Sequence, residues 1–251
     1  MKEGRSQDTI AIVAAGGSGS RVRSPRPKQF LDLAGKPLLA HTVARFVQSP
    51  DVGSVVVVLP REDFERHAQL MTRWIPPGDN LKIVSGGDSR QDSVWRGIST
   101  IPGSFEGYVL VHDGARPLVS QETIRNVVAA AKRFGGAIAG LPVTETLKEV
   151  GPDPSNAAVI VATVDRRLYY HAQTPQCFRH RTLRTALEQA RAAGFLGTDE
   201  AQLVERLGEK VYLVPGSVRN IKVTTREHLA LAEYYLKLGE RGEEDEEGAG
   251  S

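Results

Sequence analysis

Short apolar runs alternate along the chain with segments whose apolar residues recur at helical spacing. An uninterrupted apolar run is typical of a strand buried on both faces, as in a parallel sheet. Such runs occupy residues 10–15, 54–59, 81–84, 108–112, 137–143 and 211–214. Helices are predicted over residues 37–50, 61–74, 89–98, 120–134, 182–193 and 225–237, and another from about 198. The alternation predicts one α/β domain over residues 1–240, with a doubly wound, mostly parallel, Rossmann-like sheet.

Residues 144–164 break this alternation. Two strand-like segments, 144–150 and 159–164, flank a turn rich in proline and glycine and predict a β-hairpin. A projecting hairpin with apolar faces usually pairs with something, most simply with a second copy of itself. We therefore expect a β-hairpin arm that makes a homodimer.

Composition fits a soluble globular protein with a sizeable core. Of the 251 residues, 40% are hydrophobic and 25% are charged. No apolar run reaches about 18 residues, which argues against a transmembrane helix, and the polar first residues argue against a secretory signal. The single cysteine, Cys177, excludes an internal disulfide and a cysteine metal cluster. We expect a cytoplasmic protein with no membrane partner.

The charges are unevenly distributed behind a net charge of +2. Residues 243–247 are five consecutive acids, and without them 32 Lys and Arg face 25 Asp and Glu. A mildly basic body suits polyphosphate substrates, but it lacks the clustered basic face that nucleic-acid binding requires. The last residues, 241–251, are expected to form a disordered acidic tail.

A glycine-rich loop follows the first apolar run, at Gly16–Gly19. Its backbone N–H groups could cradle phosphates, and the cations Arg21 and Lys28 follow it. The dinucleotide fingerprint fails because Val22 stands where its third glycine would be, and no Gly-Lys-Ser/Thr follows to make a P-loop. An ordinary strand-to-helix turn is the alternative, but such a turn does not need two cations.

Two further loops carry candidate chemistry. Gly87, Asp88 and Ser93 could recognise a base, although a simple helix start would also use an Asp or Ser as its cap. Asp113 and Arg116 follow a strand at the edge where open α/β sheets bind ligands. Asp113 could hold Mg²⁺ or a hydroxyl and Arg116 a phosphate, or the two could form only a local ion pair. The neighbouring His112 is read as a core or orienting histidine.

Seven separated motifs resemble those of one family. The opening stretch resembles A-A-G-x-G-x-R followed by P-K-Q-[FY], with Ala14 where the family usually has proline. The other matches are G-G-x-x-R-x-x-S-V at 86–94, H-D-x-A-R-P at 112–117, T-V-D-R at 163–166, T-P-Q at 174–176, T-D-E-A at 198–201 and N-I-K-V-T at 220–224. From Ile10 to about Lys237 the chain thus resembles the 2-C-methyl-D-erythritol 4-phosphate cytidylyltransferases of the non-mevalonate isoprenoid pathway.

The resemblance implies that the protein joins CTP to 2-C-methyl-D-erythritol 4-phosphate, giving 4-diphosphocytidyl-2-C-methyl-D-erythritol and pyrophosphate. It also implies Mg²⁺ bound mainly through the CTP phosphates and a homodimer in which the arm reaches the neighbouring active site. The residues implied are, for catalysis, Arg21, Lys28, Arg166 and Lys222; for nucleotide binding, Ala15, Gly16, Gly17, Gly19, Gly87, Asp88 and Ser93; and for substrate binding, Asp113, Arg116, Thr146, Thr174 and Thr198.

For two of these residues a simpler structural role is the alternative. Helix capping alone would account for Thr198, and Lys222 could be an exposed lysine of a short strand. At the level of the whole protein, the alternatives are a cytidylyltransferase for another polyol phosphate such as ribitol 5-phosphate, a dinucleotide-binding oxidoreductase, and a nucleotide-binding module without enzymatic activity.

Overall fold

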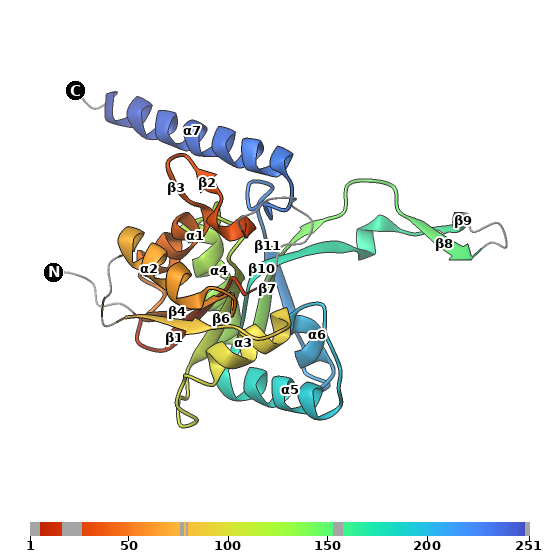
Figure 1. Cartoon of the computed structure of the whole chain (residues 1–251). Coiled ribbons are helices and arrows are strands. Elements are labelled where there is room, and N and C mark those ends of the chain that lie inside the picture. Colours follow the sequence, from red (N-terminus) through yellow and green to blue (C-terminus); the bar gives the residue numbers. More distant parts are fainter. Residues whose placement is uncertain (1–5, 17–26, 76–77, 79, 153–157, 249–251) are drawn as a thin grey trace.

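A mixed seven-stranded sheet forms the centre of the protein (Figure 1). The computed structural model describes residues 6–16, 27–75, 78, 80–152 and 158–248. The strand order is β11-β7-β10-β6-β1-β4-β5, and within this sheet only β10 runs against its neighbours. The bounds are β1 Thr9–Ala14, β4 Ser54–Leu59, β5 Leu81–Ser85, β6 Tyr108–Asp113, β7 Gly136–Pro142, β10 Tyr170–Arg179 and β11 Tyr212–Pro215. The predicted doubly wound, mostly parallel sheet is confirmed.

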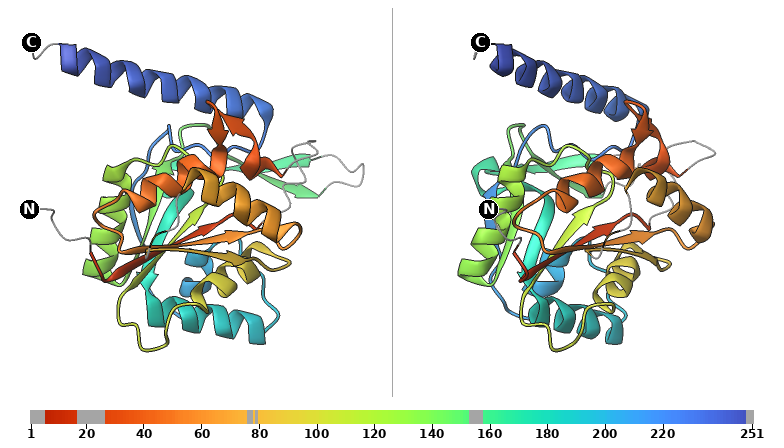
Figure 2. Two further views of the ribbon diagram at one scale, coloured as in Figure 1. Left: turned by 60° about the vertical axis from the view of Figure 1, so that its left-hand side comes forward. Right: turned by 90° about the vertical axis from the view of Figure 1, so that its left-hand side faces the viewer.

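Helices cover both faces of the sheet (Figure 2). Side chains of neighbouring strand residues point to opposite faces, so Ala11 and Val13 join one apolar core while Ile12 joins the other. The first core lies under α1, α2 and α4, and the second lies under α3, α5 and α6. The bounds are α1 Leu38–Val47, α2 Phe64–Trp74, α3 Arg90–Ile98, α4 Gln121–Phe134, α5 His180–Ala192 and α6 Glu200–Glu205.

The helix starts agree with the capping signals in the sequence. Ser120 caps α4, Ser89 caps α3 and Asp199 caps α6, where Thr198 was the residue considered as a cap. Each cap side chain accepts a hydrogen bond from the backbone N–H three residues further on. At the other end of α4, Gly135 has φ 95°, which favours glycine.

Several elements differ from the prediction, and β8 at Lys148–Pro152 instead of 144–150 is one of them. The strand β10 was not expected, because its Thr-Pro-Gln centre breaks the apolar run. α2 starts at Phe64 instead of Arg61, after Asp63 in the left-handed region. Residues 220–224 are not a strand: they join the body through a hydrogen bond from Val223 N–H to the carbonyl of Ala115. The last helix, α7 (Arg226–Gly248), continues beyond Lys237, while disorder of residues 241–251 in solution stays a prediction.

The predicted hairpin is present and projects from the body (Figure 1). It consists of β8 (Lys148–Pro152) and β9 (Ala158–Thr163), paired antiparallel in a sheet of their own. Apolar side chains on it are exposed, with Val150 at 56% and Ile160 at 59%. These side chains lack cover within the described chain, which fits an arm that pairs with something else.

A small hairpin and two short 3-10 helices complete the body. The hairpin of β2 (Asp32–Leu33) and β3 (Lys36–Pro37) carries Leu33, which packs with Ala232 of α7. The two 3-10 helices are η1 (Lys28–Phe30), after β1, and η2 (Arg166–Leu168), between β9 and β10. No helix among the described residues is long and apolar enough to cross a bilayer.

Candidate active site

A cavity of about 90 Å³ opens at the carboxyl ends of β1 and β6. Three segments predicted to form the site contribute to it: the end of β1 with Ala15 and Gly16, the start of α3 with Ser93, and the end of β6 with Asp113. Lys222, from the irregular segment before α7, also lines it. Parallel strands bring loops that are distant in sequence to one edge of the sheet, and the structure therefore joins these residues as expected.

Ser93 joins two loops of the site: the glycine-rich loop that starts at Gly16, and the loop of Gly87 and Asp88, which is the proposed base loop. The Ser93 hydroxyl donates to the carbonyl of Ser89 at 2.9 Å and accepts from Gly87 N–H at 3.2 Å. A Cβ on Gly16 would lie 2.3 Å from the Ser93 Oγ, so only glycine allows this approach. Ser93 was expected to offer its hydroxyl to a base, whereas its described contacts hold the base loop. The Asp88 side chain is exposed, 3.7 Å from Arg61.

Asp113 is the centre of a charged cluster. Its Oδ1 accepts from the Arg90 Nε at 3.1 Å, and its Oδ2 lies 2.9 Å from the Lys222 Nζ and 3.4 Å from the Arg116 Nε. Burial acts to raise the pKa of Asp113, but Arg90, Lys222 and Arg116 together hold that pKa well below its usual range. The local Asp113–Arg116 pair exists, but it is the longest of the three contacts.

Lys222 is thus part of the site. The alternative of a strand lysine is wrong, because the segment is not a strand. The Lys222 side chain is 37% exposed, and its ammonium group lies 2.9 Å from the buried Asp113 carboxylate. Arg116 is held in addition by its Nη1, which donates to the carbonyl of Asn220 at 2.8 Å.

The buried His112 contacts the Asp113 cluster through Thr174. The Thr174 hydroxyl accepts from Asp113 N–H at 3.0 Å and lies 3.1 Å from the His112 Nδ1. The His112 Nε2 lies 3.1 Å from the carbonyl of Arg116. Burial lowers the pKa of His112 to about 4, so at neutral pH the ring carries one proton. That proton is on Nε2, facing the carbonyl, while Nδ1 accepts from Thr174. Its burial and its two contacts fit the expected core or orienting histidine.

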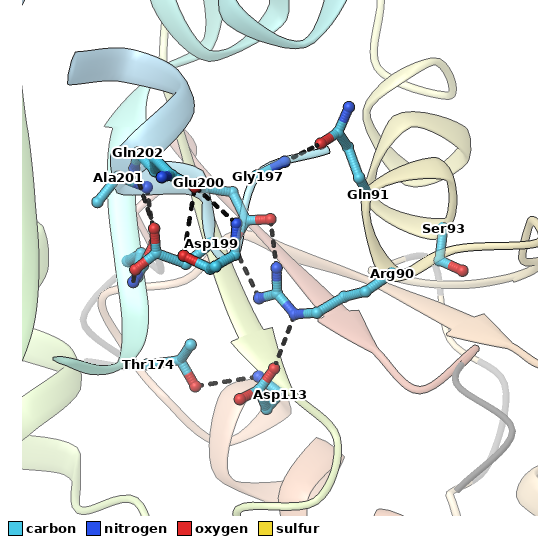
Figure 3. A network of polar contacts seen from close by, with 12 residues as sticks. Arg90, Gln91, Ser93, Asp113, Thr174, Gly197, Asp199, Glu200, Ala201 and Gln202 are labelled. Carbon is cyan, nitrogen blue, oxygen red and sulfur yellow. Dashed lines mark hydrogen bonds and ion pairs between the residues drawn. The ribbon is translucent and has the colours of Figure 1, made fainter. Parts of the chain in front are cut away.

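A buried ion pair behind the cluster was not predicted as part of the site (Figure 3). Arg90, at the start of α3, donates from Nη1 and Nη2 to the two oxygens of Glu200 at 2.7 and 2.9 Å. Glu200 starts α6 and is 1% exposed. The sequence offered one signal, an Arg and a Glu that each open a helix within a family motif, but no local pattern links residues 110 positions apart.

Three of the predicted substrate residues lie outside this cluster or behind it. Thr174 uses its hydroxyl on Asp113 and His112. Thr198 is exposed, and its backbone N–H donates to the Gln202 side chain at 2.8 Å. Thr146 is exposed on the arm.

Arg166 lies in η2, just after the arm. Its Nη1 donates to the carbonyl of Thr144, which closes the base of the arm. Arg166 and Thr146 are therefore associated with the arm and not with the Asp113 cluster of the same chain.

Arg21, Gly17 and Gly19 lie outside the described residues, as does the side chain of Lys28. The backbone of η1, which carries Lys28, is anchored on both sides. Gln29 donates from Nε2 to the carbonyl of Ala15 at 2.7 Å, and the ring of Phe30 stacks on His67 at 4.1 Å between centroids.

The described residues fit a metal held by the substrate better than one held by the protein. Among them, no three His, Cys, Asp or Glu side chains come together in a way that could hold a metal ion. Both oxygens of Asp113 already face cations, so direct ligation would require one of these to move. Mg²⁺ commonly binds through phosphates with few protein ligands.

Comparison with known proteins shows the family of the chain. The sequence profile of the 2-C-methyl-D-erythritol 4-phosphate cytidylyltransferase (IspD) family matches residues 9–238. A protein of that name from Acidobacterium capsulatum is 42% identical over 233 residues, covering 91% of this chain and 97% of its own. One from Syntrophus aciditrophicus is 42% identical over 231 residues, covering 92% and 97%.

Solved structures agree as well. The enzyme of the same name from Thermus thermophilus is 35% identical, with a TM-score of 0.72, over 92% of this chain and 100% of that one. The 4-diphosphocytidyl-2C-methyl-D-erythritol synthase from Anaerococcus prevotii is 28% identical, with a TM-score of 0.76, over 91% and 97%. With a profile match over most of its length and relatives above 40% identity, this chain belongs to the 2-C-methyl-D-erythritol 4-phosphate cytidylyltransferase family.

Proposed function

We propose that this protein transfers the cytidylyl group of CTP to 2-C-methyl-D-erythritol 4-phosphate. The observation that carries the proposal is the Asp113 cluster, in which Arg90, Arg116 and Lys222 converge on one buried carboxylate at the cavity. Three cations on one carboxylate suit a site that receives phosphate groups. The family membership supplies the substrates, and the relatives' names do not favour ribitol 5-phosphate.

The reaction requires positioning more than proton transfer. An oxygen of the substrate phosphate forms a bond to the α-phosphorus of CTP, and the bond from that phosphorus to the bridging oxygen breaks. Pyrophosphate leaves with the electron pair. The attacking phosphate is already ionised at neutral pH, so no general base is needed. Preorganised cations that face the developing charge supply most of the catalysis in such transfers.

Residues of the candidate site and of the opening loop divide this work. Lys222 lines the cavity beside Asp113. It binds phosphate oxygens together with Arg116, while Asp113 holds both cations in place or binds a substrate hydroxyl. Gly87 and Asp88 recognise cytosine through their backbone, in a loop held by Ser93. Arg21 and Lys28 hold the triphosphate, with the backbone amides of Ala15, Gly16, Gly17 and Gly19 around it.

The remaining assignments rest on the family resemblance. Mg²⁺ bound through the CTP phosphates neutralises their charge. The protein acts as a homodimer in which Arg166 and Thr146 of the arm serve the neighbouring site. Thr174 and Thr198 bind the substrate, with Thr198 near its phosphate. The exposed apolar side chains of the arm support pairing with a second copy. A cytoplasmic location stays a prediction.

A pyrophosphate-release assay tests the function. CTP, UTP, ATP and GTP are each offered with methylerythritol phosphate, and CTP is also offered with ribitol 5-phosphate. We expect pyrophosphate release only when CTP is combined with methylerythritol phosphate. Hydrogen-bonding groups placed for cytosine would be left without partners if another base were bound. Equal turnover of UTP or ATP would contradict the base assignment, and no release with any pair would contradict the function.

A further inference from the structure

We propose that Glu200 is a positioning residue that acts through Arg90 on the Asp113 carboxylate, and thereby on Lys222. The proposal rests on the proposed cytidylyl transfer and assigns a role within that site to two residues outside the set predicted from the sequence. The carboxylates of Glu200 and Asp113 share the guanidinium group of Arg90.

Glu200 takes the open end of the Arg90 guanidinium. Its two oxygens accept from Nη1 and Nη2 at 2.7 and 2.9 Å, a bidentate contact that fixes the plane of the group (Figure 3). Because the guanidinium is planar and rigid, fixing that edge also fixes the direction of the Nε–H bond. That bond points at the Asp113 Oδ1, 3.1 Å away.

The Nε contact in turn divides the Asp113 oxygens between two tasks. With Oδ1 taken by Arg90, Oδ2 faces Lys222 at 2.9 Å and Arg116 at 3.4 Å. A guanidinium free to rotate could offer two N–H groups to Asp113, which would turn the carboxylate and draw it from Lys222. Glu200 prevents that rotation.

A purely structural role does not account for Glu200. The start of α6 is already capped by Asp199, whose side chain accepts from Gln202 N–H at 2.9 Å. Burying another carboxylate beside a phosphate site is costly unless it is paired. Since Glu200 is 1% exposed, it does not reach a substrate itself and acts through the group that it holds.

The charges fit this arrangement. Two carboxylates, Glu200 and Asp113, meet three cations, Arg90, Arg116 and Lys222. Glu200 balances the charge of Arg90, so Asp113, Arg116 and Lys222 together carry one net positive charge. Lys222, which lines the cavity, is placed to meet a substrate phosphate. Loss of the Glu200 charge would leave Arg90 free to compete for Asp113 or for the substrate.

The test is steady-state kinetics of Glu200→Gln, which keeps the size of the side chain and removes its charge. We expect kcat to fall by roughly tenfold to a hundredfold, as for other residues that orient a ligand-contacting group, while the KM for CTP changes less than about twofold. The matched control is Asp199→Ala, which removes the cap of α6 and leaves the Arg90–Glu200 contact. It should lower Tm and leave kcat near that of the unchanged protein.

A double-mutant comparison separates positioning from stability. If Glu200 acts through Arg90, then adding Glu200→Gln to Arg90→Met should change kcat little further. Normal kcat in Glu200→Gln, or multiplicative effects of the two substitutions, would overturn the proposal. If Glu200→Gln fails to fold, Arg90→Lys provides the test, because lysine keeps the positive charge but lacks the planar guanidinium group. An unchanged kcat in Arg90→Lys would overturn the proposal. A lower kcat with a normal Tm would support it.

These outcomes are distinct from failure of the proposed function. If the unchanged protein releases no pyrophosphate from CTP and methylerythritol phosphate, the function is wrong. If it does so and Glu200→Gln equals it, only the role of Glu200 is wrong.

Discussion

Asp113 organises the site because it is a buried carboxylate with a cation on each side. An ionised carboxylate is costly to bury alone, and each cation placed against it lowers that cost and becomes fixed in turn. The same carboxylate therefore stabilises the fold locally and sets the positions of Arg90, Arg116 and Lys222. At the residue scale, structure and proposed catalysis depend on the same contacts.

His112 provides a test of this environment through pH. Burial lowers its pKa to about 4, against about 6.5 in an unfolded chain. Between these values the unfolded chain binds the proton and the folded chain does not, so stability falls as pH drops through this window, by up to about 3 kcal/mol. We expect His112→Gln to flatten the fall in urea-unfolding free energy between pH 7 and 4.5.

The matched control is His171→Gln, at the exposed start of β10. This substitution should leave the pH dependence as it is in the unchanged protein. A His112→Gln protein whose stability falls as steeply as before would show that His112 is not kept neutral by burial.

At the scale of elements, the site depends on close approach between the end of β1 and the start of α3. Gly16 lies so near Ser93 that a Cβ would come within 2.3 Å of the hydroxyl oxygen. Ser93 holds the base loop at Gly87, so this one contact sets the distance between the proposed phosphate-binding loop and the proposed base-binding loop.

Gly16→Ala should destabilise the protein by about 1–3 kcal/mol, the usual cost of overpacking. In Gly16→Ala with Ser93→Ala the nearest atom becomes the residue 93 Cβ, 3.1 Å away in the present structure, so part of the loss should be recovered. Urea unfolding measures both. Gly103→Ala is the control, since nothing lies within 4 Å of its added Cβ. Fully additive costs would rule out the contact as the cause.

The opening loop is predicted to be the catalytic cradle. Arg21→Ala and Lys28→Ala should each lower kcat by roughly two to four powers of ten, as loss of other preorganised charges does. Compared with Arg21→Ala, Arg21→Lys should recover little of the lost kcat if Arg21 binds phosphate through its planar guanidinium group. It should recover most of the lost kcat if Arg21 acts only as a point charge. Steady-state kinetics with both substrates decides, and near-normal turnover in both alanine variants would remove the basis for the cradle.

At the scale of the whole molecule, the arm exposes apolar side chains that the described part of a single chain does not cover. Its two strands pair only with each other in the described structure, and Val150, Val159, Ile160 and Val161 are exposed on it. Exposed apolar strands favour association. The base of the arm carries Arg166, which we propose serves the active site of a second copy.

Mixing two inactive variants tests the shared site. Lys28→Ala and Arg166→Ala damage a site from different chains, so each mixed dimer should contain one site with neither lesion and regain activity. Light scattering should show a dimer at micromolar concentration. If the two variants exchange subunits and activity does not return, the active site is not shared between two chains. If the protein is a monomer, the arm does not form a dimer.

The sequence by itself determined the elements whose energies are local. Apolar runs marked β1, β4 and β6, because a strand buried on both faces needs apolar side chains throughout. Ser120 and Gly135 marked the ends of α4, because capping and a positive φ are properties of single residues. The residues of the motifs marked the family and most of the site.

Only the tertiary structure decided how distant segments meet. It placed β10 antiparallel between β6 and β7, where the polar Thr174 reaches Asp113. It also joined Arg90 to Glu200 and brought Lys222 to the same carboxylate. Such contacts depend on the packing of the whole sheet and its helices, so their favourable energy appears in no local window of the sequence. That is the physical reason why Arg116 and Lys222 could be expected at the site from the sequence, while Arg90 and the contacts that join these cations to Asp113 and Glu200 could not.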